Sequence, residues 1–180
     1  MKDLEIYIHI PFCVKKCAYC DFLSGPAGEK EKEEYVKMLV DEIRNCPDTV
    51  QNYRVISIFF GGGTPSLLTG EQIGRLMDTV REIFTLDEDA EITMEMNPGT
   101  VTEEKLRKYR QAGVNRLSIG LQSVNDEELR LLGRIHTYEE FLEAYHLARA
   151  NGFANINVDL ISAIPGQTVE SWRRTLEQVM

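Results

Sequence analysis

The chain has 180 residues, of which 43% are hydrophobic and 27% charged, a balance typical of a globular domain and not of a disordered or fibrous chain. Its formal charge of -9 disfavours nucleic acid and anionic membrane surfaces as partners, so we expect a small organic ligand. No apolar run approaches the roughly 20 residues that span a bilayer, and no signal-peptide pattern is apparent, so a cytoplasmic location is expected.

Apolar runs typical of strands alternate along the chain with amphipathic stretches typical of helices. In chain order, the pattern predicts strand 4–10, a helix near 31–45, strand 55–60, a helix near 70–84, strand 91–97, a helix near 102–112, strand 116–122, helices within 125–150, strand 155–161 and a helix from about 168. Thr69, Thr102 and Thr168 are candidate helix N-caps, and Gly113 and Gly152 stand where helix-ending glycines are expected. Five successive βα units predict parallel strands joined by right-handed crossovers.

Each of four predicted strands has one apolar face and one face of polar or small residues. The second face carries Tyr7, His9, Thr93, Glu95, Asn97, Ser118, Gly120, Gln122, Asn155, Asn157 and Asp159. A sheet covered by helices on both sides would read as nearly continuous Val, Ile and Leu, so a polar face predicts a barrel-like sheet around a ligand site. An antiparallel sheet with one wet face is the alternative, but the long helical crossovers disfavour it.

The chain stops at Met180, inside or just after the fifth helical unit. An open parallel barrel that ended there would expose its fifth strand as an edge. We therefore expect one domain over 1–180 that lacks at least one strand at its C-terminal end.

Three of the four cysteines, Cys13, Cys17 and Cys20, fall within CVKKCAYC after the first predicted strand. Cysteines this close together are more naturally ligands to one centre than a disulfide framework. They can hold three irons of a cubane cluster and leave the fourth iron open. The alternative is a zinc site with His9 or Cys46 as fourth ligand; otherwise we interpret Cys46 as a structural thiol.

Two segments resemble motifs of the radical S-adenosylmethionine (SAM) superfamily. HIPFCVKKCAYCDF resembles its cluster loop, and FFGGGTPSLL, after the second predicted strand, resembles its glycine-rich SAM motif. Further similarity in EMNPGT, RLSIGLQS, LGRIHTYEEF, NINVDLI and IPGQTVESW extends to the oxygen-independent coproporphyrinogen III oxidase family, and within it to the HemW-type heme chaperones. The resemblance implies a partial (β/α)6 radical SAM barrel, with a [4Fe–4S] cluster and SAM as cofactors and reductive SAM cleavage to a 5′-deoxyadenosyl radical.

The same resemblance assigns site residues. It implies that Cys13, Cys17 and Cys20 are the cluster ligands and that SAM is contacted by Gly62, Gly63, Thr64, Glu95, Gln122, Arg134 and Asp159. Tyr7 and Tyr19 match positions near the cluster or the adenine, with core packing as the alternative. A satisfied polar network is the alternative for the acids and Gln122, and a solvated helix position is the alternative for Arg134. The motifs single out no separate catalytic residue.

Two departures from the family pattern bear on function. The oxidases carry a further cysteine two residues after the third cluster cysteine, whereas this chain has Phe22. Phe22 therefore favours a heme chaperone that delivers heme to acceptor proteins over a coproporphyrinogen decarboxylase. The implied partners are SAM, heme or porphyrin, heme-acceptor proteins, and a reductant such as flavodoxin or ferredoxin. Ala163 replaces an expected glycine, which is costly only where the backbone needs a positive φ.

Overall fold

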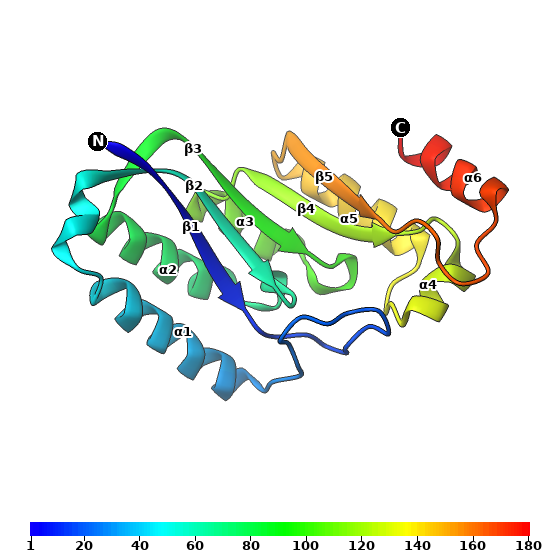
Figure 1. The fold of residues 1–180 in the computed structure, drawn as a ribbon, viewed down its shortest axis with the longest axis horizontal. Helices are drawn as coiled ribbons and strands as arrows, with labels where there is room; N and C mark the ends of the chain where they lie inside the picture. The colour runs from blue at the N-terminus through cyan, green and yellow to red at the C-terminus, as the bar shows by residue number, and fades with distance from the viewer.

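The computed structural model describes all 180 residues and contains a single five-stranded sheet (Figure 1). Its strands are β1 (Lys2–Ile10), β2 (Tyr53–Gly62), β3 (Thr85–Met96), β4 (Arg116–Gln122) and β5 (Asn155–Leu160). They pair in parallel in the order β1-β2-β3-β4-β5. The predicted α/β fold with five parallel strands is confirmed.

Six helices connect and follow the strands. They are α1 (Glu29–Arg44), α2 (Gly70–Ile83), α3 (Glu103–Ala112), α4 (Asp126–Leu132), α5 (Tyr138–Ala150) and α6 (Val169–Val179). The hydroxyls of Thr69, Thr102 and Thr168 each accept a backbone N–H in the first turn of the following helix, as predicted. Gly113 and Gly152 end helices at φ values of 106° and 85°. No helix has the length and apolar character needed to cross a membrane.

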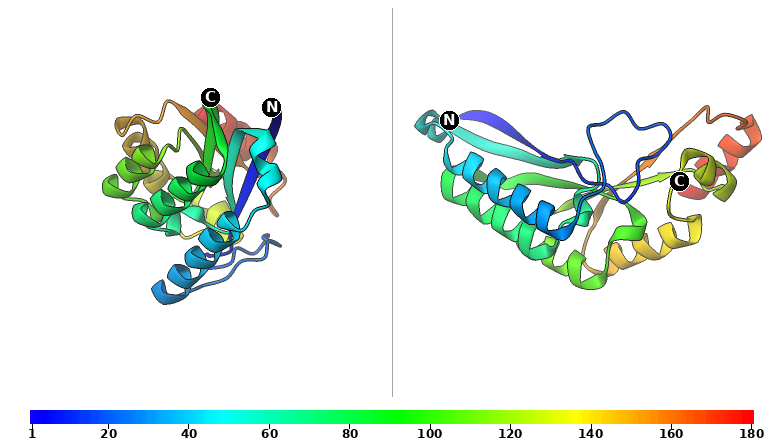
Figure 2. Two further views of the ribbon diagram at one scale, coloured as in Figure 1. Left: turned by 90° about the vertical axis from the view of Figure 1, so that its left-hand side faces the viewer. Right: turned by 90° about the horizontal axis from the view of Figure 1, so that it is seen from below.

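Helices α1, α2, α3 and α5 lie on one side of the sheet, and the segment that carries the cysteines lies on the other (Figure 2). The sequential strand order explains this, because right-handed crossovers that always advance in one direction place every helix on the same face. The hydrophobic core lies between the helices and the sheet. Its fully buried strand residues include Ile10, Phe60, Met94 and Ile119. The predicted barrel-like arrangement is confirmed.

The opposite, concave face carries the polar positions that the sequence predicts. The Ser118 hydroxyl on β4 donates to Asp159 Oδ2 on β5 at 2.9 Å, and the Asn157 amide donates to Asp159 Oδ1 at 2.7 Å. Thr93 and Ser118 are buried. Ser118, Asn157 and Asp159 bond to each other and Thr93 donates to Glu91, so the sheet tolerates these polar groups beneath the cysteine segment.

Strand β3 begins six residues earlier than the sequence predicts. The added segment, TLDEDA, has no alternating apolar pattern, and the β2–β3 register shifts between Val55 and Ser57. The Asp87 carboxylate accepts the backbone N–H of Asp89 at 2.9 Å within this irregular stretch. Acidic, largely exposed residues at the edge of the pairing thus conceal the start of the strand from periodicity arguments.

Candidate functional site

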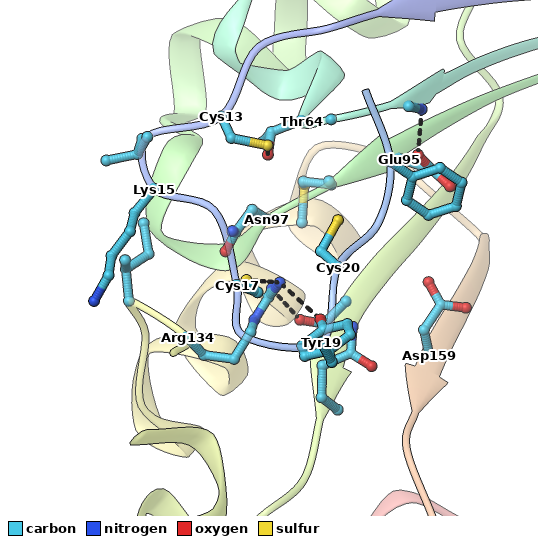
Figure 3. A pocket seen from close by; sticks show the side chains of 18 of the residues that line it. Cys13, Lys15, Cys17, Tyr19, Cys20, Thr64, Glu95, Asn97, Arg134 and Asp159 are labelled. Atoms are coloured by element: carbon cyan, nitrogen blue, oxygen red, sulfur yellow. Dashed lines mark hydrogen bonds between the residues drawn. The ribbon is translucent and has the colours of Figure 1, made fainter. Parts of the chain in front are cut away.

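A cavity of about 230 Å³ lies at the carboxyl ends of β2 to β5, beneath the cysteine segment (Figure 3). Ligand sites in parallel βα proteins lie at this end of the sheet, because the strand-to-helix loops gather there. Its walls come from the cysteine segment, from the turns after β2 and β3, from β4 and β5, and from the loop after α4. All three clustered cysteines line it.

The segment from Pro11 to Gly28, here called the cysteine loop, is closed at its base and fixed at its tip. At the base, Cys13 N–H donates to Gly25 O at 2.9 Å and Gly25 N–H donates to Pro11 O at 3.0 Å. At the tip, Ala18 N–H donates to Leu132 O at the end of α4, at 2.9 Å. These backbone bonds hold three thiols over the strand ends without a disulfide.

The thiols surround the cavity and do not converge on one point. No group of three or more His, Cys, Asp or Glu side chains is arranged to hold a single metal ion, whereas structural zinc takes four ligands at about 2.0–2.3 Å. Neither alternative fourth ligand is available, since Cys46 follows α1 and His9 is bonded to Tyr7 and to the Leu23 carbonyl. Three free thiols around an open space fit a polynuclear cluster better than zinc.

Two cysteines accept hydrogen bonds from other residues of the cavity wall. Thr64 Oγ1 donates to Cys13 Sγ at 3.6 Å, and Arg134 Nη1 donates to Cys17 Sγ at 3.8 Å. Donors of this kind stabilise negative charge on ligating sulfur. The glycine-rich turn and the loop after α4 therefore both contact the cysteine loop through its sulfurs.

The glycines after β2 are required for close packing against β1 and the cysteine loop. Gly62 has a φ of 114°, and a Cβ there would lie 2.5 Å from the His9 ring. A Cβ on Gly63 would lie 2.6 Å from the Phe12 carbonyl oxygen. Thr64 N–H also donates to that oxygen, at 2.7 Å. The sequence associates these glycines with SAM, and the structure adds that they seat the turn against the loop.

Glu95, Gln122 and Asp159 all line the cavity, as their shared strand face predicts. Burial raises the pKa of the Glu95 carboxyl, the Gly62 N–H bond opposes that rise, and the neighbouring Asp159 charge adds to it. Gln122 ends β4 with a φ of 75°, a conformation that a non-glycine residue adopts at a cost of about 1–3 kcal/mol. A strained residue and a carboxyl with a raised pKa are features common at functional sites, which makes this wall a candidate site.

Arg134 is half-buried in the cavity wall, in the loop that follows α4. Its Nη2 donates to Gly120 O at 2.7 Å and its Nη1 lies 3.5 Å from the Tyr19 hydroxyl, but its buried Nε has no partner. The Gly120 bond fixes the guanidinium in the cavity wall, where its positive charge can pair with an anionic group. Arg134 therefore does not occupy the solvated helix surface that was the alternative interpretation of this residue.

The two predicted tyrosines have different surroundings. Tyr19 lines the cavity, and burial raises the pKa of its hydroxyl against the opposing charge of Arg134. Tyr7 does not line it; its ring stacks on Phe59 with centroids 6.1 Å apart, and its hydroxyl bonds to His9. A cofactor contact by Tyr7 stays a prediction.

The site residues assigned from the sequence omit Asn97, at the end of β3. Its side chain lines the cavity, and its buried Oδ1 has no hydrogen-bond partner. A buried acceptor without a partner is uncommon in folded proteins and makes Asn97 a candidate site residue. The sequence does place Asn97 on the predicted polar face of the sheet, and this position could have identified it as a site residue. Val14 and Lys15, which lie between two of the clustered cysteines, also line the cavity, as does Ile135, which no motif indicates.

The remaining histidines do not face the cavity. His136 is buried, and burial together with the Arg134 charge lowers its pKa to about 4. His146 is exposed on α5, on the helical side of the sheet. Neither is placed to ligate a metal or heme iron in the cavity.

Comparison with known proteins agrees with this geometry. Residues 7–179 match the Radical SAM superfamily. The chain is 46% identical over 181 residues to the heme chaperone HemW of Escherichia coli, covering all of this chain and 48% of that protein. It is 39% identical over 184 residues to the oxygen-independent coproporphyrinogen-III oxidase-like protein HemZ of Bacillus subtilis, covering 98% of this chain and 36% of that protein.

Among solved structures, coproporphyrinogen III oxidase (HemN) from Escherichia coli superimposes with a TM-score of 0.90 at 37% identity. That alignment covers 99% of this chain and 41% of HemN. The chain thus spans about half the length, or less, of the relatives it matches.

Proposed function

This chain belongs to the radical SAM superfamily, and on that premise we propose that it binds a [4Fe–4S] cluster and SAM in the cavity and serves as a heme chaperone. The observation that carries the proposal is that three free thiols, Glu95 and Arg134 all line one cavity at the strand ends. Cys13, Cys17 and Cys20 would hold the cluster, which would supply the electron for reductive cleavage of SAM. The protein itself orients SAM and limits its exposure to water.

The polar groups of the cavity match the functional groups of SAM. Arg134, which lines the cavity, would bind the carboxylate of the methionine part. Glu95 and the Asn97 carbonyl would accept hydrogen bonds from the ammonium group, and Asp159 from the ribose hydroxyls. The Gly62–Thr64 turn brings backbone close to the same space. Cys13, Cys17 and Cys20 would ligate three irons and leave the fourth to SAM.

Heme transfer is the preferred overall function because of the residue after the cluster motif and the similarity to HemW. Phe22 is exposed at the cavity mouth and supplies no thiol where the oxidases carry an additional cysteine. The 46% identity to HemW supports the same assignment. Protein acceptors of heme and a reductant of the flavodoxin or ferredoxin class are the partners that this function requires.

A second candidate is oxygen-independent oxidation of coproporphyrinogen III. The similarity to HemZ and the TM-score of 0.90 to HemN favour it. Both functions use the same cavity and differ in whether porphyrin is cargo or substrate.

Anaerobic reconstitution followed by two assays distinguishes them. A chaperone binds added heme with a stable Soret band and yields no protoporphyrinogen from coproporphyrinogen III with SAM and reductant. Porphyrinogen turnover by the reconstituted protein would establish the second candidate. Failure to bind heme, with cluster and SAM in place, would reject the first.

A further inference from the structure

Three apolar side chains are exposed around the cavity mouth, where Val14, Phe22 and Ile135 form what we call the apolar rim. Their exposed fractions are 56%, 63% and 42%, and all three line the cavity. Val14 and Phe22 come from the cysteine loop and Ile135 follows α4. Leu23, next to Phe22, is also exposed. Exposed apolar side chains that line the same pocket are typical of a ligand-contacting surface.

Two lysines of the same loop border this rim. Lys15 lines the cavity and extends outward at its edge (Figure 3), and Lys16 Nζ donates to the Phe22 carbonyl at 3.1 Å. Neither lysine forms an ion pair, although the exposed Asp21 lies in the same loop. In a chain with a net charge of -9, two unpaired cations beside apolar side chains favour an amphiphilic anion.

We propose that the apolar rim and the two lysines form a porphyrin-docking surface. One face of the macrocycle packs on Val14, Phe22 and Ile135, and the propionates pair with Lys15 and Lys16. The inference rests on the proposed heme-binding function and adds where and how the porphyrin is held. A protein partner alone would need about 600 Å² or more on this side, whereas a small apolar rim with adjacent cations suits a flat ligand with carboxylates on one edge.

The surface recognises the macrocycle and not the iron. No histidine belongs to it, because His9 is bonded within the protein, His136 is buried and His146 lies on α5. The cysteine thiols are committed to the cluster in the reconstituted protein. Metal-free protoporphyrin IX should therefore bind with an affinity close to that of heme, and its dimethyl ester, which lacks the propionate charges, should bind more weakly.

The test is equilibrium dialysis of heme and metal-free protoporphyrin IX against anaerobically reconstituted protein with SAM. Phe22→Ala should weaken both ligands about tenfold, and Phe22→Leu much less, because about 1.5 kcal/mol of apolar contact is lost only in the first. Lys15→Gln combined with Lys16→Gln should weaken heme binding several-fold at low salt and have little effect on the dimethyl ester. Iron content is measured for each variant to confirm an intact cluster.

Matched controls lie on α1, away from the rim. Met38 is 68% exposed and Lys30 has an 89% exposed side chain, so Met38→Ala and Lys30→Gln should leave both affinities unchanged. If the unsubstituted protein binds no porphyrin, the proposed function fails together with this inference. If it binds heme but the rim and lysine variants match the controls, or if metal-free porphyrin does not bind, only the docking surface is overturned.

Discussion

Glu95 Oε2 accepts the backbone N–H of Gly62 at 2.9 Å, which joins the end of β3 to the glycine-rich turn after β2. Burial raises the pKa of this carboxyl in the folded protein. The stability that it contributes is therefore present below the ordinary carboxyl pKa of about 4.3 and lost as pH rises through the folded-state value. Keeping Glu95 ionised near neutral pH costs stability, which is consistent with a ligand-binding role.

Glu95→Gln keeps an acceptor for Gly62 but removes the charge. We expect its free energy of unfolding to exceed that of the parent at pH 7 and to converge with it near pH 4. The reconstituted variant should bind SAM about tenfold or more weakly, because a charge-assisted hydrogen bond to the ammonium group is lost. Denaturation across pH 4–8 and SAM dialysis measure both; equal SAM affinity in parent and variant would remove Glu95 from the site.

Ala163 has a φ of 59°, so the replacement of an expected glycine does place an alanine in the left-handed region. Ala163→Gly should raise the free energy of unfolding by about 0.5–1 kcal/mol, since the relief of strain exceeds the added chain entropy. Ala150→Gly, at the end of α5, should lower it. Chemical denaturation gives both values, and destabilisation by Ala163→Gly would contradict the left-handed assignment.

Tyr109 on α3 holds the loop that follows the glycine-rich turn. Its buried hydroxyl lies 2.6 Å from Leu68 O and 3.2 Å from Ser66 O. Tyr109→Phe should cost about 1–3 kcal/mol of stability, because the buried Leu68 carbonyl loses its side-chain donor, whereas Ser66 O keeps Lys105 Nζ at 2.9 Å. Tyr145→Phe is the matched control, since no hydrogen bond involves the Tyr145 hydroxyl. Thermal unfolding of both variants settles the comparison, and equal melting temperatures would argue against this anchor.

Thr64 provides a test of how the protein tunes the proposed cluster. Thr64→Val removes the hydroxyl that donates to Cys13 Sγ but keeps the side-chain volume and the backbone bond to Phe12. We expect a lower cluster reduction potential with unchanged iron content, because a donor to sulfur stabilises the reduced, more negative state. Redox titration followed by electron paramagnetic resonance measures this shift.

The control for that titration is Thr79→Val. Thr79 is buried in α2 and its hydroxyl donates to Arg75 O within the helix, far from the cavity wall. Its potential should equal that of the parent. A potential for Thr64→Val that also equals the parent would show that this hydroxyl does not act on the cluster.

Local sequence patterns predict most of the fold. The apolar alternation in β4 correctly assigns Leu117 and Ile119 to the core and Ser118 to the concave face, because period-2 alternation is a property of the strand itself. The threonine N-caps are predictable for the same reason, because each hydroxyl bonds to a backbone N–H only three residues further along the chain. The start of β3 could not be predicted in this way. Its acidic residues give no periodic signal, and the segment pairs with β2 only in the folded sheet.

The site is less accessible to such reasoning where contacts cross between loops. Nothing local shows that the Gly62 backbone must clear the His9 ring, or that Ile135 and Val14 line the same cavity. Asn97 stands on the predicted polar face, but only the packed structure leaves its carbonyl without a partner. The Tyr7 ring stacks on Phe59 outside the cavity lining, so the cofactor contact that the resemblance implies for it stays a prediction.

The most direct test is iron and sulfide analysis of anaerobically reconstituted protein in which Cys13, Cys17 and Cys20 are replaced by serine, with Cys46→Ser as the control. The parent and the Cys46→Ser protein should each hold about four irons per chain and show the same visible spectrum. The triple variant should hold almost none and be colourless. Parental iron content and spectrum in the triple variant would contradict the assignment of this cavity as a cluster site.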